Sequence, residues 1–147
     1  MIKGRPIKIL LVEDDRAHAE IVRRNLKDFR VANKIVLVED GQAALDYLFR
    51  QAAYTDPKTS PRPDLILLDL RLPKVDGLEV LRRIKEDADL ERLPTVVLTT
   101  SDAESDIVSA YTQGACSYLV KPVDFEKFTK LMAAFGFYWL AWNRFPD

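Results

Sequence analysis

The chain has very few of the residues that cross-link proteins or bind soft metals. Cys116 is its only cysteine, so no disulfide can form within the chain, as is typical of a reducing compartment. His18 is its only histidine, which excludes a metal site made of several histidines. We expect Cys116 to be a buried or half-buried apolar residue rather than a nucleophile, and His18 to lie on the surface.

Long apolar stretches and an excess charge of one sign are also missing. No segment approaches the roughly 20 residues of a membrane-spanning helix, and residues 1–15 contain no signal-peptide core. Lys and Arg number 22 against 23 Asp and Glu, a net charge of -1, which gives no general attraction to nucleic acid or anionic membranes. We therefore expect a cytoplasmic protein that binds neither.

Apolar residues are plentiful enough for a core, at 48% of a chain of 147 residues, and this length fits one domain over residues 1–147. Five short apolar segments alternate with helical patterns. The segments are Ile7–Val12, Lys34–Val38, Leu65–Asp69, Thr95–Thr99 and Ser117–Val120. They are continuous rather than alternating, which is typical of parallel strands buried on both faces.

The segments between and after these strands repeat apolar residues at helical spacing. The repeats are Val22, Leu26 and Phe29; Ala44, Leu45 and Leu48; Leu78, Leu81 and Ile84; Ile107, Val108 and Tyr111; and Phe125, Phe128, Leu131, Met132 and Phe135. The order predicts an α/β fold, a (βα)5 doubly wound parallel sheet of five strands with helices on both faces.

Two segments depart from this regular plan. The stretch around 51–63 is rich in Pro, Thr and Ser, which predicts an exposed loop insertion. The stretch around 135–147 is dense in aromatic residues and extends the last helix. Its aromatic side chains either continue the core stripe of that helix or form a homodimer surface, because so dense an apolar patch seldom stays exposed.

Polar residues gather at the ends of the predicted strands. Glu13 and Asp14 follow the first strand, Asp69 ends the third, Thr99 ends the fourth and Lys121 follows the fifth. Ligands of doubly wound sheets bind outside the carboxyl ends of the strands. Three acids gathered there would repel one another, and a hard divalent cation, Mg²⁺ or Mn²⁺, would relieve this repulsion. Such a site can bring an anionic phosphodonor beside a carboxylate nucleophile.

Each of these residues is ambiguous when taken singly. Asp14 could be a helix N-cap, Asp69 a turn former and Thr99 an ordinary strand-terminal residue. Together and in this order they favour phosphoryl chemistry. Lys121 would pair with Asp69 and later with a phosphoryl oxygen, and the Thr99 hydroxyl could donate to another. With a divalent cation the phosphorylated site would carry a charge of about −1, against about −3 without it.

Four pieces of the chain resemble the response-regulator receiver family of two-component systems. They are ILLVEDD (Ile9–Asp15), LILLDLRLPKVDG (Leu65–Gly77), LPTVVLTTS (Leu93–Ser101) and GACSYLVKP (Gly114–Pro122). The resemblance covers nearly the whole chain and implies a flavodoxin-like receiver fold. It further implies that Asp69 is the phosphoacceptor, that Asp14 binds the metal directly and Glu13 through water, and that the backbone carbonyl of Arg71 is another ligand.

The same resemblance implies a switch and a backbone feature. Thr99 and Tyr118 correspond to the switch pair, in which the ring moves inward after Thr99 closes on the phosphoryl group. The Lys121–Pro122 bond is usually cis in this family, which would aim the lysine into the site.

The loop insertion and the terminal FGFYWL (Phe135–Leu140) are similar to segments of the small response regulators paired with bacterial and cyanobacterial phytochromes. This similarity implies that the donor is a phosphohistidine on a red-light-sensing histidine kinase. Such relatives often form homodimers through the fourth helix, fifth strand and fifth helix. The protein would signal through its own surface, without an output domain.

Three residues depart from the usual pattern of the family. Arg71 replaces a small polar residue two positions after the phosphoacceptor. Thr100 stands where Ala or Gly is common, and Ser101 where an acid or amide would orient an attacking water. An arginine at position 71 could shield or pair with the phosphoryl group, so we predict slow self-dephosphorylation.

Three other functions are disfavoured by particular residues of the chain. A haloacid-dehalogenase-like phosphatase needs a second acid at the position of Arg71, so sustained turnover is disfavoured and we expect a phosphoacceptor signalling protein rather than an enzyme. A flavin or nucleotide binder needs a Ser, Thr or Gly-rich loop where Glu13–Asp15 stands. An adaptor that acts without being phosphorylated would not need Asp69, Thr99 and Lys121, so the presence of all three disfavours this function.

Overall fold

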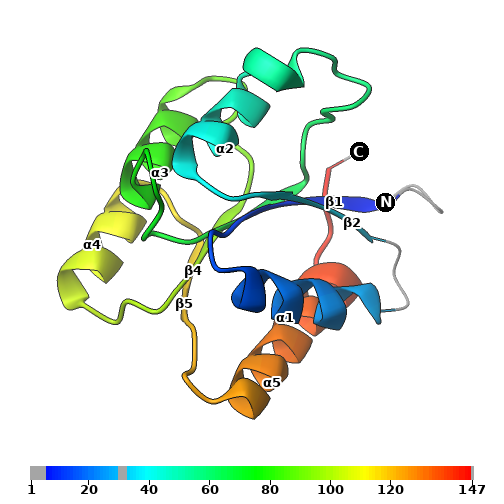
Figure 1. Cartoon of the computed structure of the whole chain (residues 1–147), viewed down its shortest axis with the longest axis vertical. Coiled ribbons are helices and arrows are strands. Elements are labelled where there is room, and N and C mark those ends of the chain that lie inside the picture. Colours follow the sequence, from blue (N-terminus) through cyan, green and yellow to red (C-terminus); the bar gives the residue numbers. More distant parts are fainter. Residues whose placement is uncertain (1–5, 30–32, 147) are drawn as a thin grey trace.

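The computed structural model describes residues 6–29 and 33–146, which form one parallel five-stranded sheet in the order β2-β1-β3-β4-β5, with helices on both faces (Figure 1). The strands are β1 (Ile7–Val12), β2 (Asn33–Val38), β3 (Leu65–Leu68), β4 (Thr95–Thr99) and β5 (Ser117–Val120). The helices are α1 (Arg16–Lys27), α2 (Gly41–Leu48), α3 (Gly77–Glu86), α4 (Glu104–Thr112) and α5 (Phe125–Gly136), with a 3₁₀ turn η1 (Ala52–Tyr54) and a π-helix η2 (Phe137–Trp142). The predicted fold class is confirmed. Residues 1–5, 30–32 and 147 of the predicted single domain lie outside the described residues.

The two faces of the sheet are covered by different helices. Leu10 and Val12 of β1 pack into the cluster under α2 and α3, whereas Ile9 and Leu11 pack into the cluster under α1 and α5. This division follows from the alternation of side chains along a strand. Figure 1 shows α1 and α5 side by side on one face and α2, α3 and α4 on the other. The core therefore has two layers, one on each side of the sheet.

Burial on both faces holds for the central strands only. β1, β3 and β4 are almost wholly buried, whereas β2 and β5 are half-buried because each lies at an edge of the sheet. Cys116, which precedes β5, is exposed, so the expected burial is wrong. Its thiol donates a hydrogen bond to the Thr95 carbonyl at 3.4 Å, but no further strand covers it.

The register of the sheet brings the ends of β1 and β3 together. Val12 pairs with Leu68, and the Asp69 N–H donates to the Val12 carbonyl at 3.1 Å. Glu13 and Asp69 are therefore the next residues along two adjacent parallel strands. In the strand order observed, the chain winds away in opposite directions from β1 and β3, so this is the topological switch point.

Gly77 lets α3 begin immediately beside this point. Its N–H donates to the Leu70 carbonyl at 2.9 Å. A Cβ at position 77 would lie 2.4 Å from the Asp69 carbonyl oxygen and 2.5 Å from the Leu70 Cα. No side chain fits at such a separation, so only glycine allows this approach.

The helix α4 does not bury the apolar residues that its sequence pattern predicts. Val108 and Tyr111 are 54% and 51% exposed, and Ala110 is the buried residue of the helix. α4 contacts α3 and the edge strand β5, so less of the core is available for it to cover. Phe125, expected on the core stripe of α5, is 66% exposed as the first residue of that helix.

The loop insertion is exposed in its first part and docked in its second. Most residues of 51–59 are exposed, but Ser60 and Pro63 are buried, so exposure of the whole loop is not observed. The Tyr47 hydroxyl donates to the Pro61 carbonyl and the Arg62 guanidinium to the Leu48 carbonyl, both at 2.8 Å. These two bonds attach the end of the loop to α2.

The aromatic extension divides between core and surface. Leu140 and Phe145 are buried in the cluster under α1 and α5, while Phe137, Tyr138 and Trp142 are at least 57% exposed. The segment therefore continues the core stripe and also leaves an aromatic surface. Among the described residues, no helix has both the length and the hydropathy that crossing a bilayer requires.

Candidate functional site

Three carboxylates meet at the switch point between β1 and β3. Glu13, Asp14 and Asp69 each offer an oxygen within 4.8 Å of the other two, with Asp14 exposed and the other two buried. Asp69 Oδ1 accepts the Arg71 N–H at 3.3 Å, and Glu13 Oε2 accepts the Asp15 N–H at 3.2 Å. Each of these oxygens keeps a lone pair for a cation. This cluster of hard oxygen donors suits Mg²⁺ or Mn²⁺.

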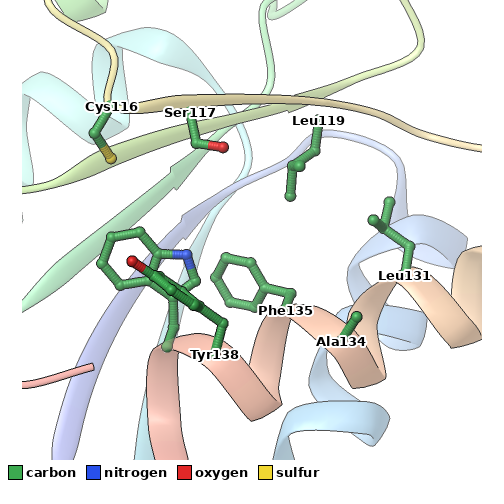
Figure 2. Close-up of a pocket in the computed structure, with 8 residues that line it drawn as sticks. Cys116, Ser117, Leu119, Leu131, Ala134, Phe135 and Tyr138 are labelled. Carbon is green, nitrogen blue, oxygen red and sulfur yellow. The ribbon is translucent and has the colours of Figure 1, made fainter. Parts of the chain in front are cut away.

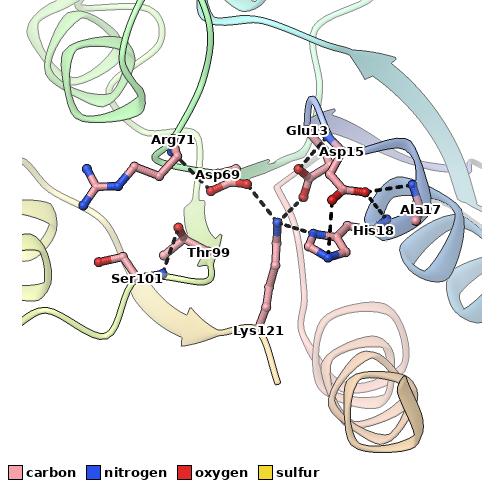
Figure 3. A network of polar contacts seen from close by, with 9 residues as sticks. All are labelled: Glu13, Asp15, Ala17, His18, Asp69, Arg71, Thr99, Ser101 and Lys121. Atoms are coloured by element: carbon pink, nitrogen blue, oxygen red, sulfur yellow. Dashed lines mark hydrogen bonds and ion pairs between the residues drawn. The ribbon is translucent and has the colours of Figure 1, made fainter. Parts of the chain in front are cut away.

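Lys121 is the counter-charge of this cluster. Its side chain is 1% exposed, and its ammonium lies 2.5 Å from Glu13 Oε1 and 2.8 Å from Asp69 Oδ2 (Figure 3). The lysine reaches this position although the described residues contain no cis peptide bond. The expected cis Lys121–Pro122 bond is therefore wrong, because the long lysine stem spans the distance from a trans backbone. The Lys121 N–H donates to the Thr99 carbonyl at 2.7 Å, which continues the β4–β5 ladder.

The two buried carboxyl groups differ in acidity. Burial opposes ionisation of Asp69, but the hydrogen bond and charge of Lys121, with a hydrogen bond from Thr99, outweigh it and hold its pKa below the usual value. Burial is the dominant effect at Glu13 and raises its pKa from 4.5 to about 7, although Lys121 partly offsets this. Asp69 is therefore the more acidic of the two, and Glu13 is the one that gains a proton as the pH falls through about 7.

Thr99 and Tyr118 meet at the loop that follows β4. Thr99 is buried, and its hydroxyl accepts the Ser101 N–H at 3.4 Å. The Tyr118 hydroxyl donates to the Ser101 carbonyl at 2.9 Å. The two residues expected to act as a switch are therefore connected through Ser101. Thr100 is exposed beside them.

Arg71 points away from Asp69 and toward α4 (Figure 3). Its guanidinium lies 2.5 Å from Asp106 Oδ2, and the Ser101 hydroxyl donates to the same oxygen. Asp106 thus connects the loop after β3 to the loop after β4. The sequence pattern does not indicate this ion pair, because its partners are 35 positions apart.

His18 is a site residue that the sequence analysis missed. It was expected on the surface, but its side chain is 27% exposed and its Nδ1 lies 3.0 Å from the Lys121 ammonium. The helical pattern of α1 gives no sign of this contact with the end of β5, which lies 103 positions away. Only the packing of α1 against α5 brings the two residues together.

Comparisons with known proteins agree with this geometry. The family model described as "Response regulator receiver domain" matches residues 9–133. The "Probable methanogenesis regulatory protein FilR2" of Methanothrix harundinacea is 45% identical over 96% of this chain and 88% of its own. "Response regulator Rcp1" of Synechocystis is 42% identical over 92% of this chain and 90% of its own.

Two solved structures are similar over 97% of this chain and the whole of theirs. One is the Mn²⁺-bound form of Rcp1, with a TM-score of 0.92 and 41% identity. The other is the phosphorylated cyanobacterial phytochrome response regulator RcpA, with a TM-score of 0.92 and 38% identity. The matched residues include the acidic cluster, the ends of β3 and β4, and Lys121. The chain therefore belongs to the response regulator receiver domain family.

Proposed function

We propose that this response regulator accepts a phosphoryl group on Asp69 from a phosphohistidine of a sensor histidine kinase. The observation that carries the proposal is the buried Asp69–Lys121 ion pair of 2.8 Å beside two further carboxylates. The low pKa of Asp69 keeps its carboxylate ionised and able to attack. A carboxylate oxygen attacks phosphorus in line while the bond from phosphorus to the donor nitrogen breaks, and that nitrogen keeps the electron pair.

Mg²⁺ is the cation that we propose for the site. Asp14 and Asp69 would bind it directly, Glu13 through water, and the Arg71 backbone carbonyl would supply another oxygen. The bound cation supplies charge neutralisation between the donor phosphate and the acids. The Mn²⁺ bound in the Rcp1 structure belongs to that relative and supports the proposal, because both ions prefer oxygen ligands.

Thr99 and Tyr118 form the proposed switch. After transfer, the Thr99 hydroxyl donates to a phosphoryl oxygen and Lys121 pairs with another. Movement of Thr99 would break its contact with the Ser101 N–H and disturb the Ser101 carbonyl that holds Tyr118. The ring of Tyr118 is then free to move inward, which changes the surface beside α4.

We propose that the protein turns over no other substrate, so that phosphorylation and slow self-dephosphorylation are its only reactions. A phosphatase of the aspartyl type needs a general acid near Asp69, and Arg71 cannot donate a proton at neutral pH. The guanidinium is also engaged by Asp106. We also propose that the reaction takes place in the cytoplasm, without nucleic acid or membrane as partner, which the near-neutral net charge of -1 supports.

A phytochrome-type kinase is the proposed donor. Support comes from two similar proteins, the cyanobacterial phytochrome response regulator RcpA and the bacteriophytochrome response regulator RtBRR, which are 38% and 40% identical to this chain. The test is transfer from a purified, radiolabelled phytochrome-type kinase to the wild-type chain and to Asp69→Asn. We expect rapid labelling of the wild type alone. Equal labelling by a kinase of another sensor class would contradict the phytochrome pairing. This comparison is needed because FilR2, which is 45% identical to this chain, is described as a methanogenesis regulatory protein.

We also propose a homodimer through α4, β5 and α5. The eight large hydrophobic side chains exposed in the described part of the chain all belong to this region and to η2. They are Val108, Tyr111, Val120, Val123, Phe125, Phe137, Tyr138 and Trp142. A groove of about 450 Å³ lies beside the edge strand β5, between Cys116, Leu119, Phe135 and Tyr138 (Figure 2). A second copy would cover this apolar surface and the free edge of β5.

A further inference from the structure

The Lys121 ammonium has three donors, and the structure gives each of them an acceptor. Glu13 Oε1 lies at 2.5 Å, Asp69 Oδ2 at 2.8 Å and His18 Nδ1 at 3.0 Å (Figure 3). A lysine has no lone pair to offer, so Nδ1 of His18 must be the acceptor and its ring proton must lie on Nε2. The neutral imidazole therefore completes the coordination of the ammonium.

The ring of His18 is itself held in place. Its Nε2 lies 3.6 Å from Asp15 Oδ2, and Asp15 caps α1 by accepting the N–H groups of Ala17 and His18. The other side of the ring packs on Phe128 of α5, with 5.6 Å between ring centroids. This separation is too long for a hydrogen bond, so the Asp15 carboxylate favours a proton on Nε2 through its charge alone. Burial and the charge of Lys121 also lower the pKa of His18, which favours the neutral ring.

His18 contacts the Lys121 ammonium through a neutral imidazole, whereas Glu13 and Asp69 contact it through carboxyl oxygens. When Asp69 becomes an ester of phosphate, Lys121 must exchange a carboxylate oxygen for a phosphoryl oxygen. His18 carries no charge and does not compete with the phosphoryl group for the ammonium. The hydrogen bond from Lys121 to His18 can therefore persist before and after phosphoryl transfer.

We propose that His18 is a positioning residue, which holds the Lys121 ammonium toward Asp69 through Nδ1 and so speeds phosphoryl transfer. The role in transfer rests on the proposed function, whereas the hold on Lys121 does not.

The test compares His18→Leu with His18→Asn. Leucine keeps an apolar contact with Phe128 but accepts no hydrogen bond, whereas the Asn side-chain oxygen can occupy the place of Nδ1. Heteronuclear NMR of the metal-free protein reads the Lys121 ammonium directly, with the signal assigned by its loss in Lys121→Met. We expect a slowly exchanging signal in the wild type and His18→Asn, and clearly faster exchange in His18→Leu, where Glu13 and Asp69 are the two acceptors that remain.

Phosphorylation by acetyl phosphate and Mg²⁺ gives the second readout. We expect the rate to fall about five- to tenfold in His18→Leu, the effect of losing one hydrogen bond to a charged group at a partly exposed position, and to recover in His18→Asn. The proposal would be overturned if His18→Leu kept the ammonium signal and the phosphorylation rate of the wild type. It would also be overturned if His18→Leu and His18→Asn lost signal and rate equally. No adduct in the wild type would contradict the proposed function instead, and the NMR signal would still decide whether His18 holds Lys121.

Discussion

At the residue scale, the site depends on how two buried carboxyl groups share one ammonium. Lys121 contacts both Glu13 and Asp69, and all three side chains are at least nine-tenths buried. One positive charge only partly compensates two buried negative charges, so burial raises the pKa of one carboxyl group when no cation is present. Glu13 is that group, with a pKa of about 7, while the pKa of Asp69 is lowered and its carboxylate stays ionised for attack.

The first prediction concerns the pH dependence of metal binding. The raised pKa of Glu13, about 7, means that the carboxylate is largely protonated below that pH and becomes a metal-binding anion above it. Mg²⁺ affinity should therefore rise with pH, by about tenfold between about pH 6 and about pH 8. Calorimetric titration in buffers of different ionisation enthalpy would also detect the released proton. Equal affinity at both pH values would show that Glu13 is already ionised in the metal-free protein.

The second prediction concerns Arg71, whose guanidinium pairs with Asp106 and points away from Asp69 before phosphorylation (Figure 3). Arg71→Asn should shorten the phosphoryl half-life by roughly threefold or more, because it removes a cation that shields or pairs with the phosphoryl group. Lys74→Asn, a similar charge change on the same loop, is the control. The remaining adduct would be followed by intact-mass spectrometry. A half-life that does not shorten in Arg71→Asn would argue against slow dephosphorylation caused by this residue.

At the element scale, the strands and their order follow directly from the sequence. Apolar runs locate all five strands to within one residue, because buried parallel strands need continuous apolar segments. Helix packing is harder to predict. Val108 and Tyr111 have core-like spacing but are exposed, since the spacing does not show how much sheet lies under α4.

In the candidate site, too, some residues could be predicted from the local sequence pattern and others could not. The sequence indicated Glu13, Asp14, Asp69 and Lys121, because strand ends meet at one edge of a parallel sheet. It did not indicate His18, whose partner lies on a distant strand end. Contacts that depend on the packing of one helix against another cannot be read from the pattern of either.

The third prediction concerns the start of α3. Gly77→Ala would place a Cβ 2.4 Å from the Asp69 carbonyl oxygen, so the helix or the strand end must shift. The variant should lose about 3 kcal/mol of stability and phosphorylate more slowly. Urea denaturation measures the first effect. Glu86→Ala, at an exposed position of the same helix, should change stability by about 0.5 kcal/mol or less, and an equally small loss in Gly77→Ala would contradict the steric account.

At the scale of the whole molecule, apolar exposure is concentrated between α4 and η2. Truncation after Gly136 would remove this aromatic surface, but it would also remove Leu140 and Phe145, which are buried in the core. Substitution of exposed side chains is therefore the cleaner test of dimerisation.

The fourth prediction is that Tyr111→Ser combined with Phe125→Ser converts a dimer to a monomer, because these side chains are 51% and 66% exposed and lie on α4 and α5 of the proposed interface. Light scattering coupled to size exclusion gives the mass, and thermal unfolding checks that the variant is folded. Arg23→Ser combined with Lys27→Ser, at exposed positions of α1, is the control and should leave the mass unchanged. A wild-type protein of monomer mass at high concentration would contradict the dimer.

The central claim is that Asp69 accepts a phosphoryl group in a reaction that requires a divalent cation. Its most direct test is intact-mass spectrometry after incubation with acetyl phosphate and Mg²⁺, beside Asp69→Ala and an EDTA control. We predict a single phosphoryl adduct on the wild-type chain, absent in the variant and without metal. A folded wild-type protein that forms no adduct, or an adduct that persists in Asp69→Ala, would contradict the claim.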